Sequence, residues 1–170
     1  MKPNEINDNL YEPVLNKIIN FIAYASRSHS EVENRLNKYL YKKELSEEDA
    51  DEIKTRIKHT LEDLKLLDDE QYARSYVEGR IRSGKPLSKR KISEFLFKKG
   101  ISRELTEEVL KLFTEEIELV AINELIDKKL VTLRVGNSRK NRQKLISYLL
   151  NKGFSPHLVY PAVDTKTNLQ

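Results

Sequence analysis

The sequence predicts an all-α protein of three tandem three-helix repeats that form an elongated body, curved or straight. Three observations support this fold. Only 5 glycines and 5 prolines interrupt the 170 residues, which favours long helices. Hydrophobic residues make up 38% and charged residues 34%, so thin helical layers with solvated faces fit better than one thick core. The third observation is an internal repeat.

The internal repeat has three copies of a helix–stop–helix pattern. Residues 40–46 read Leu-Tyr-Lys-Lys-Glu-Leu-Ser, residues 96–102 read Leu-Phe-Lys-Lys-Gly-Ile-Ser, and residues 149–155 read Leu-Leu-Asn-Lys-Gly-Phe-Ser. In each copy a helix ends, a left-handed stop follows, an apolar residue enters the core and a serine caps the next helix. Glu44 replaces the glycine of the other copies, so we expect strain or a different shape there. Each unit is too small to bury its face alone, so the units must pack in a row.

Caps and stops divide the chain into nine expected helices. Pro13 suits the first turn of one helix. The other expected caps are Ser46, Asp68, Ser88, Ser102, Thr114, Ser138 and Ser155. The expected stops are Gly84, Gly100, Gly136 and Gly153. The apolar residues at equivalent positions are Leu36 and Leu40, Ile92 and Leu96, Leu145 and Leu149, and Ile53, Val109 and Ala162.

The expected organisation follows from these helices. A flexible N-terminus covers 1–10, the repeats cover 11–66, 67–113 and 114–165, and a flexible tail covers 166–170. The polar start has no signal-peptide hydrophobic region, and the apolar runs are too short to span a bilayer. With no cysteine, the chain suits a reducing compartment. We therefore expect a cytoplasmic protein that does not enter a membrane. We also expect it to be a monomer.

The sequence offers no catalytic centre, cofactor site or metal site. Residues 79–85 match most of the phosphate-binding pattern G-x-x-x-x-G-K, but Pro86 stands where a serine or threonine would hold magnesium. The segment before it has helical rather than strand periodicity. The pair Asp68 and Asp69 fits a helix start better than a metal site. We therefore predict a protein that is not an enzyme.

Charge is distributed in blocks of alternating sign, although the net charge is only +4. Residues 85–103 hold seven bases against Glu94 alone, and residues 128–144 hold seven bases and no acid. Such rows of cations can hold a polyanion or an acidic protein groove through many weak contacts. The alternative for any single lysine is a solvated helix face. The basic residues singled out are Lys89, Arg90, Lys91, Lys98 and Lys99 in the second repeat, and Arg139, Lys140, Arg142 and Lys144 in the third.

A family resemblance emerges from the order of these residues. The pattern reads Arg27-Ser28-x-x-Glu31-Val32, then Leu67-Asp68-Asp69-Glu70-x-Tyr72-Ala73, Val77-x-x-Arg80 and Gly84, then Ile92-x-x-Phe95-Leu96-x-Lys98-Lys99-Gly100-Ile101. This order resembles the RecX family, the bacterial modulators of the RecA recombinase. The block 67–101 is the most specific part. Weaker agreement extends over about 11–163, and the region 128–137 matches poorly.

The resemblance implies both a fold and a function. The implied fold is three tandem three-helix repeats. The implied function is to bind in the groove of the RecA–DNA filament and limit its extension, or promote its disassembly, so that RecA's recombinase, ATPase and coprotease activities fall. This would place the chain in homologous recombination, DNA repair and the SOS response. Arg80 joins the predicted contact residues, with a structural ion pair as its alternative.

Two other functions remain open at this stage. A direct DNA-binding protein could place a basic helix of a three-helix unit in a groove, with or without RecA. A helical-repeat scaffold could bind another protein and leave RecA unaffected. The direction of regulation also stays open, because a modulator can promote as well as inhibit.

Overall fold

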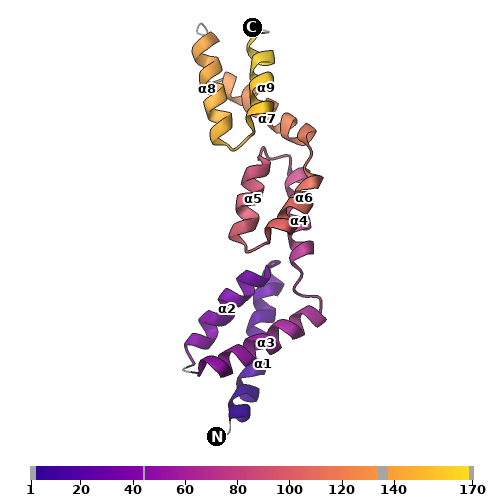
Figure 1. The fold of residues 1–170 in the computed structure, drawn as a ribbon, viewed down its shortest axis with the longest axis vertical. Helices are drawn as coiled ribbons and strands as arrows, with labels where there is room; N and C mark the ends of the chain where they lie inside the picture. Colours follow the sequence, from indigo (N-terminus) through magenta and orange to yellow (C-terminus); the bar gives the residue numbers. More distant parts are fainter. Residues whose placement is uncertain (1–2, 44, 134–137, 169–170) are drawn as a thin grey trace. The chain divides into compact units, whose positions relative to one another are not determined.

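The chain folds into helices joined by short turns. The computed structural model describes residues 3–43, 45–133 and 138–168, and all of its regular elements are helical (Figure 1). The helices are α1 (Pro3–Tyr24), α2 (His29–Tyr41), α3 (Glu47–Asp63), α4 (Asp69–Ser83), α5 (Lys89–Lys98), α6 (Arg103–Val109), the 3-10 helix η1 (Leu110–Leu112), α7 (Glu115–Leu130), α8 (Ser138–Asn151) and α9 (Pro156–Asn168). Across these described ranges, the predicted all-α class and the nine α-helices are confirmed.

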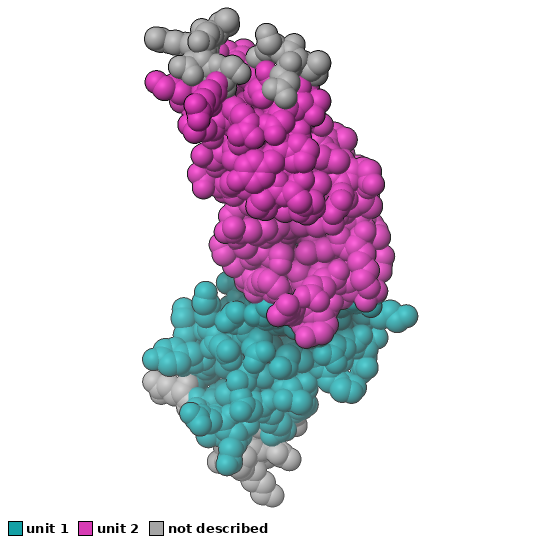
Figure 2. Space-filling model, turned by 45° about the horizontal axis from the view of Figure 1, so that its top comes forward, with its two compact units in different colours: residues 1–72, 99–101 teal, residues 73–98, 102–170 magenta. Residues whose placement is uncertain are grey.

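The helices gather into two compact units, coloured separately in Figure 2. Unit 1 comprises Met1–Tyr72 and Lys99–Ile101, and unit 2 comprises Ala73–Lys98 and Ser102–Gln170. The second predicted repeat, 67–113, therefore contributes to both units. The short segment Lys99–Ile101 follows α5 and contains the central glycine stop.

In unit 1, one core lies among α1, α2 and α3. Apolar residues recur every three to four positions on each helix, so one face of each is buried. Ile18, Leu36 and Ile57 are fully buried. Tyr11 at the edge of this core shares a hydrogen bond of 2.7 Å with the Thr60 hydroxyl. The remaining buried members are Val14, Leu15, Val32, Leu40, Ile53, Leu61 and Leu67.

In unit 2, the largest core lies among α7, α8 and α9. Its fully buried members include Ile122, Ile126 and Leu149. Ile92 and Leu96 of α5 are also fully buried, and the rings of Tyr76 and Phe95 stack with their centroids 4.1 Å apart. All nine apolar positions that the repeat predicted as equivalent are buried.

The predicted caps and stops account for most helix ends. Ser46 accepts the Asp49 amide, Ser102 accepts the Leu105 amide and Asp68 accepts the Gln71 amide. Thr114 precedes α7 but makes no side-chain cap hydrogen bond. The stops at Gly84, Gly100 and Gly153 have φ of 59°, 78° and 88°, the left-handed region that favours glycine. Glu44 and Gly136 lie outside the described residues.

Both chain ends differ from the prediction. Helix α1 begins at Pro3, so Pro13 lies inside it and residues 3–10 of the expected flexible N-terminus are helical. Proline needs no amide hydrogen bond at a helix start, and Pro3 takes that place instead of Pro13. Helix α9 continues to Asn168, into the expected tail. Its last turn is anchored by Lys166, whose ammonium lies 2.7 Å from the Asp127 carboxylate of α7.

Replacing Gly100 with alanine should destabilise the protein more than the same change at Gly84. Both residues have positive φ, which costs alanine about 1–2 kcal/mol. A Cβ at Gly100 would also overlap the Ser30 side chain, whereas a Cβ at Gly84 meets open space. We expect Gly84→Ala to lower the melting temperature by a few degrees and Gly100→Ala to lower it by clearly more. Thermal unfolding followed by circular dichroism checks this, and equal losses would contradict the close packing at Gly100.

Candidate functional site

Two buried serines each bind the carbonyl of the residue that precedes a stop glycine elsewhere in the same unit. In unit 1, the Ser28 hydroxyl donates to the Lys99 carbonyl at 2.5 Å and accepts the Glu31 amide at 3.3 Å. In unit 2, the Ser88 hydroxyl donates to the Lys152 carbonyl at 2.9 Å and accepts the Lys91 amide at 3.3 Å. Both serines are fully buried. Each one caps its own helix and also holds the residue before a stop glycine.

A carboxylate completes each arrangement. The His29 amide donates to Asp69 at 2.9 Å, and the Lys89 amide donates to Glu118 at 2.8 Å. Asp69 and Glu118 lie in the first turns of α4 and α7. We call each set of serine, carbonyl, carboxylate and stop glycine a serine joint. Each joint satisfies amides at a helix N-terminus, where negative charge is favourable.

The joints also engage part of the predicted basic cluster. The Lys99 ammonium lies 2.5 Å from the Glu31 carboxylate, which Arg27 approaches at 3.6 Å. Lys99 therefore holds the unit 1 joint, although the sequence placed it among the partner contacts. Lys89 contributes its backbone amide to the unit 2 joint, and its side chain is half-buried.

Arg90 and Lys91 are both paired with one acid on α5. Glu94 lies 2.9 Å from the Arg90 guanidinium and 2.6 Å from the Lys91 ammonium. Hydrogen bonds from Lys91 and then Arg90 lower the pKa of Glu94 from its ordinary 4.5 to about 2. The three groups lie at the surface, so this cluster keeps a net positive charge that a partner can reach.

Arg80 lies against an aromatic ring rather than a carboxylate. Its guanidinium carbon is 4.9 Å from the centre of the Tyr76 ring, which stacks on Phe95. Such a cation–π contact leaves the outer edge of the guanidinium available for further hydrogen bonds. Among the described residues, no carboxylate pairs with Arg80. The structural ion pair considered for Arg80 is therefore not formed within them.

The cations of α8 divide into two kinds. Arg142 binds Asp164 of α9 through two hydrogen bonds of 2.6 and 3.1 Å, which lower the pKa of Asp164 and raise that of Arg142. Lys140 and Lys144 instead line an open hollow of about 620 Å³ with Lys129 and Tyr148. Arg139 is exposed at the start of the same helix.

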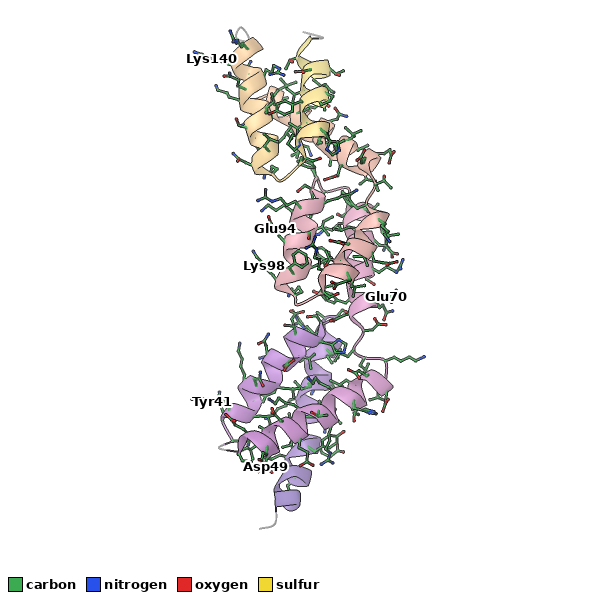
Figure 3. All side chains as sticks on the ribbon, in the orientation of Figure 1. Tyr41, Asp49, Glu70, Glu94, Lys98 and Lys140 are labelled. Atoms are coloured by element: carbon green, nitrogen blue, oxygen red, sulfur yellow. The ribbon has the colours of Figure 1, made fainter. Side chains whose placement is uncertain are left out.

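The predicted cations that remain exposed lie on two helices of unit 2, α5 and α8. Figure 3 shows the labelled Lys98 of α5 and Lys140 of α8 on the same side of unit 2 in that view. Within the ranges that the structure describes, no carboxylate pairs with Lys98, Arg139 or Lys144. These residues form, with Lys140, what we call the basic face.

The described part of the chain contains no group of three or more acidic or histidine residues arranged to hold a metal ion. None of its described helices is long and apolar enough to cross a membrane.

Comparisons with known proteins identify the family. Models of the second and third three-helix domains of RecX match residues 68–110 and 115–163. The regulatory protein RecX of Finegoldia magna is 31% identical over 163 residues, covering 88% of this chain and 74% of that protein. The chain belongs to the RecX family. The predicted repeats 67–113 and 114–165 enclose the two matched ranges, while their exact limits stay a prediction.

Other RecX relatives show the same similarity over different shares of their length. The regulatory protein RecX of Enterococcus faecalis is 28% identical, and the alignment covers 97% of this chain but 62% of that protein. The regulatory protein RecX of Oceanobacillus iheyensis is 32% identical, and the alignment covers 83% of this chain and 48% of that protein. The chain therefore spans less than two thirds of the length of these two relatives.

A solved structure supports the fold of RecX three-helix repeats. The crystal structure of RecX from Lactobacillus salivarius has a TM-score of 0.75 with this chain at 26% identity, covering 94% of this chain and 97% of that one. The predicted fold of tandem three-helix repeats is thereby confirmed. The relatives are named as regulatory proteins rather than by a reaction, which agrees with the prediction of a protein that is not an enzyme.

The Glu94 carboxylate should titrate far below the ordinary range. Because its folded-state pKa of about 2 lies below 4.5, its pairing stabilises the fold above pH 4.5, and this contribution is lost as the pH falls toward 2. Side-chain NMR should give a midpoint near pH 2, and Lys91→Met should raise it toward 4.5. A midpoint near 4.5 in the unmodified protein would show that the α5 cations are not held by Glu94.

Proposed function

We propose that the chain is a non-enzymatic regulator that binds the RecA–DNA filament, blocks its extension and so mostly inhibits RecA's recombinase, ATPase and coprotease activities. Membership of the RecX family carries this proposal. The proposed setting is the cytoplasm, and the proposed acting form is a monomer. Homologous recombination, DNA repair and the SOS response are the processes it would affect.

The basic face of unit 2 supports the proposal in chemical terms. A nucleoprotein filament presents phosphates and acidic side chains, and α5 and α8 present the exposed cations Lys98, Arg139 and Lys144. An exposed ion pair contributes only about 0–1 kcal/mol, whereas a micromolar complex needs about 8 kcal/mol. The cations must therefore act together and alongside other contacts. Lys98, Arg139, Lys140 and Lys144 are the residues we expect to contribute most.

The engaged cations have a different role in this proposal. Lys99 and Arg142 hold the fold through Glu31 and Asp164, so their loss should lower stability before it lowers binding. Three cations lie at the start of α5 and add to the positive charge around this helix: Lys89, Arg90 and Lys91. Arg80 is held by Tyr76 and keeps a free edge for the filament.

Direct DNA binding is the second candidate function. The hollow lined by Lys129, Lys140 and Lys144 also contains Tyr148. The centre of the Tyr148 ring lies 5.5 Å from the Lys129 ammonium and 5.6 Å from the Lys152 ammonium. Cations around an aromatic ring are typical of single-strand binding. Titration of labelled single-stranded DNA without RecA at two salt concentrations distinguishes the candidates. Tight binding with a steep salt dependence would favour direct DNA binding.

Reversing charge on the basic face should weaken inhibition of RecA. RecA ATPase on single-stranded DNA is measured with substoichiometric amounts of the chain, which we expect to lower the rate. The double variant Lys98→Glu and Lys144→Glu should need at least about tenfold more protein for the same inhibition, because attractive contacts become repulsive. Its melting temperature should change little, since both side chains are exposed.

The matched control reverses two exposed cations outside α5 and α8. The double variant Lys43→Glu and Lys111→Glu makes the same change in net charge. It therefore distinguishes an effect of the basic face from an effect of the overall charge of the chain. We expect the control to inhibit nearly as well as the unmodified chain. An unmodified chain without effect on the ATPase would refute the proposed function, whereas equal losses in the two double variants would refute only the basic face.

A further inference from the structure

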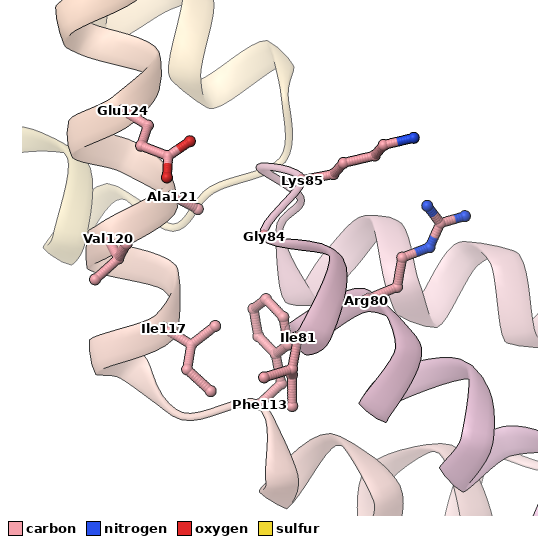
Figure 4. A pocket seen from close by; sticks show the side chains of 9 residues that line it. All are labelled: Arg80, Ile81, Gly84, Lys85, Phe113, Ile117, Val120, Ala121 and Glu124. Carbon is pink, nitrogen blue, oxygen red and sulfur yellow. The ribbon is translucent and has the colours of Figure 1, made fainter.

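An apolar cleft in unit 2 lies beside the C-terminal end of α4 and along α7 (Figure 4). Ile81, Phe113 and Ile117 face one another in it, and Val120 and Ala121 of α7 continue the lining. Arg80, Gly84, Lys85 and Glu124 complete the lining. The cleft is separate from the basic face on α5 and α8.

The size of the cleft limits what can occupy it. Its volume is about 210 Å³. An apolar cavity of about 150 Å³ holds benzene, and sites for cofactors and drug-sized ligands occupy about 300–1,000 Å³. The cleft is thus too small for a typical cofactor and large enough for one aromatic or branched aliphatic side chain.

The apolar lining is open to a partner. Val120 is 60% exposed, although it stands next to Ala121, which is 8% exposed, and near Phe113, which is 3% exposed. The buried residues form a fixed floor and the exposed valine forms part of the rim. An exposed apolar patch beside a preformed hollow is typical of a site that receives an anchor side chain from another protein.

The charges around the cleft favour an acidic partner. Arg80 and Lys85 contribute two cations, and in the described ranges neither forms an ion pair with a carboxylate. The acid of the lining, Glu124, lies 3.5 Å from the Lys128 ammonium, which offsets its charge. The lining therefore carries two cations and one acid that already has a basic partner, so carboxylates beside the inserted side chain would be attracted.

We propose that this cleft receives one bulky apolar side chain from a surface segment of RecA in which carboxylates flank that residue. This inference rests on the proposed function and adds to it an anchor that the basic face lacks. The inserted side chain excludes water from the lining, while Arg80 and Lys85 bind the flanking carboxylates. Phosphates alone would contact Arg80 and Lys85 but would leave the apolar floor without an occupant.

The test compares two aspartate variants of exposed valines. Val120→Asp places a charge in the cleft, whereas Val131→Asp changes a valine that is 87% exposed and lies outside the lining. Binding to RecA filaments on fluorescent single-stranded DNA is measured by anisotropy. We expect Val120→Asp to weaken binding at least about tenfold, Val131→Asp to change it less than about twofold, and Val120→Leu to retain it.

A second variant, at an exposed lysine, shows whether a loss of binding comes from the cleft and not from unfolding. Lys85→Glu leaves the apolar lining intact and should also weaken filament binding, while both variants keep a melting temperature close to that of the unmodified chain. Because the chain has no cysteine, Val120→Cys accepts a benzophenone label at one position only. That label should crosslink to RecA protein, and the same label at Val131→Cys should not.

The possible outcomes separate the two proposals. Failure of the unmodified chain to bind filaments would refute the proposed function and this inference together. Filament binding that survives both Val120→Asp and Lys85→Glu would refute the cleft alone. Equal losses for the two aspartate variants, or a crosslink from position 120 only to DNA or to a second copy of the chain, would also overturn it.

Discussion

The serine joint is the interaction on which the arrangement of this chain depends. A buried hydroxyl in each unit caps one helix and binds the carbonyl before a stop glycine, and a nearby carboxylate accepts the next amide. Leaving such buried groups unpaired would cost about 1–3 kcal/mol each. The glycine is required because it lies against the serine segment with a positive φ. The repeated sequence pattern is therefore a contact surface as well as a helix stop.

In unit 2 the joint has a consequence for function. Ser88, before α5, binds the Lys152 carbonyl that follows α8. The first amide of α5 binds Glu118 in the first turn of α7. The buried sides of α5 and α8 face their neighbours, so Lys98 and Lys144 remain outside. The fold thus engages Lys99 and Arg142 in internal ion pairs, and it leaves Lys98 and Lys144 exposed.

Much of this structure follows from local rules in the sequence. Caps such as Ser46 and Ser102, stops such as Gly153 and the spacing of the core leucines act within a few residues, so the sequence shows them directly. The ion pair of Lys99 with Glu31 joins residues 68 positions apart, and no local pattern indicates it. The start of α1 at Pro3 was missed because Pro13 satisfies the same local rule. The apolar cleft needs residues from α4 and α7, which only the folded chain brings together.

The most direct test of the account is hydrogen exchange of this chain with and without RecA filaments, resolved by peptide. The basic face and the cleft both belong to unit 2, so bound filament should slow exchange in α5, in α8 and around residues 117–124. The helices α1 and α3 of unit 1 should exchange at unchanged rates. Slowed exchange confined to α1–α3, with α5, α8 and residues 117–124 unaffected, would contradict the account.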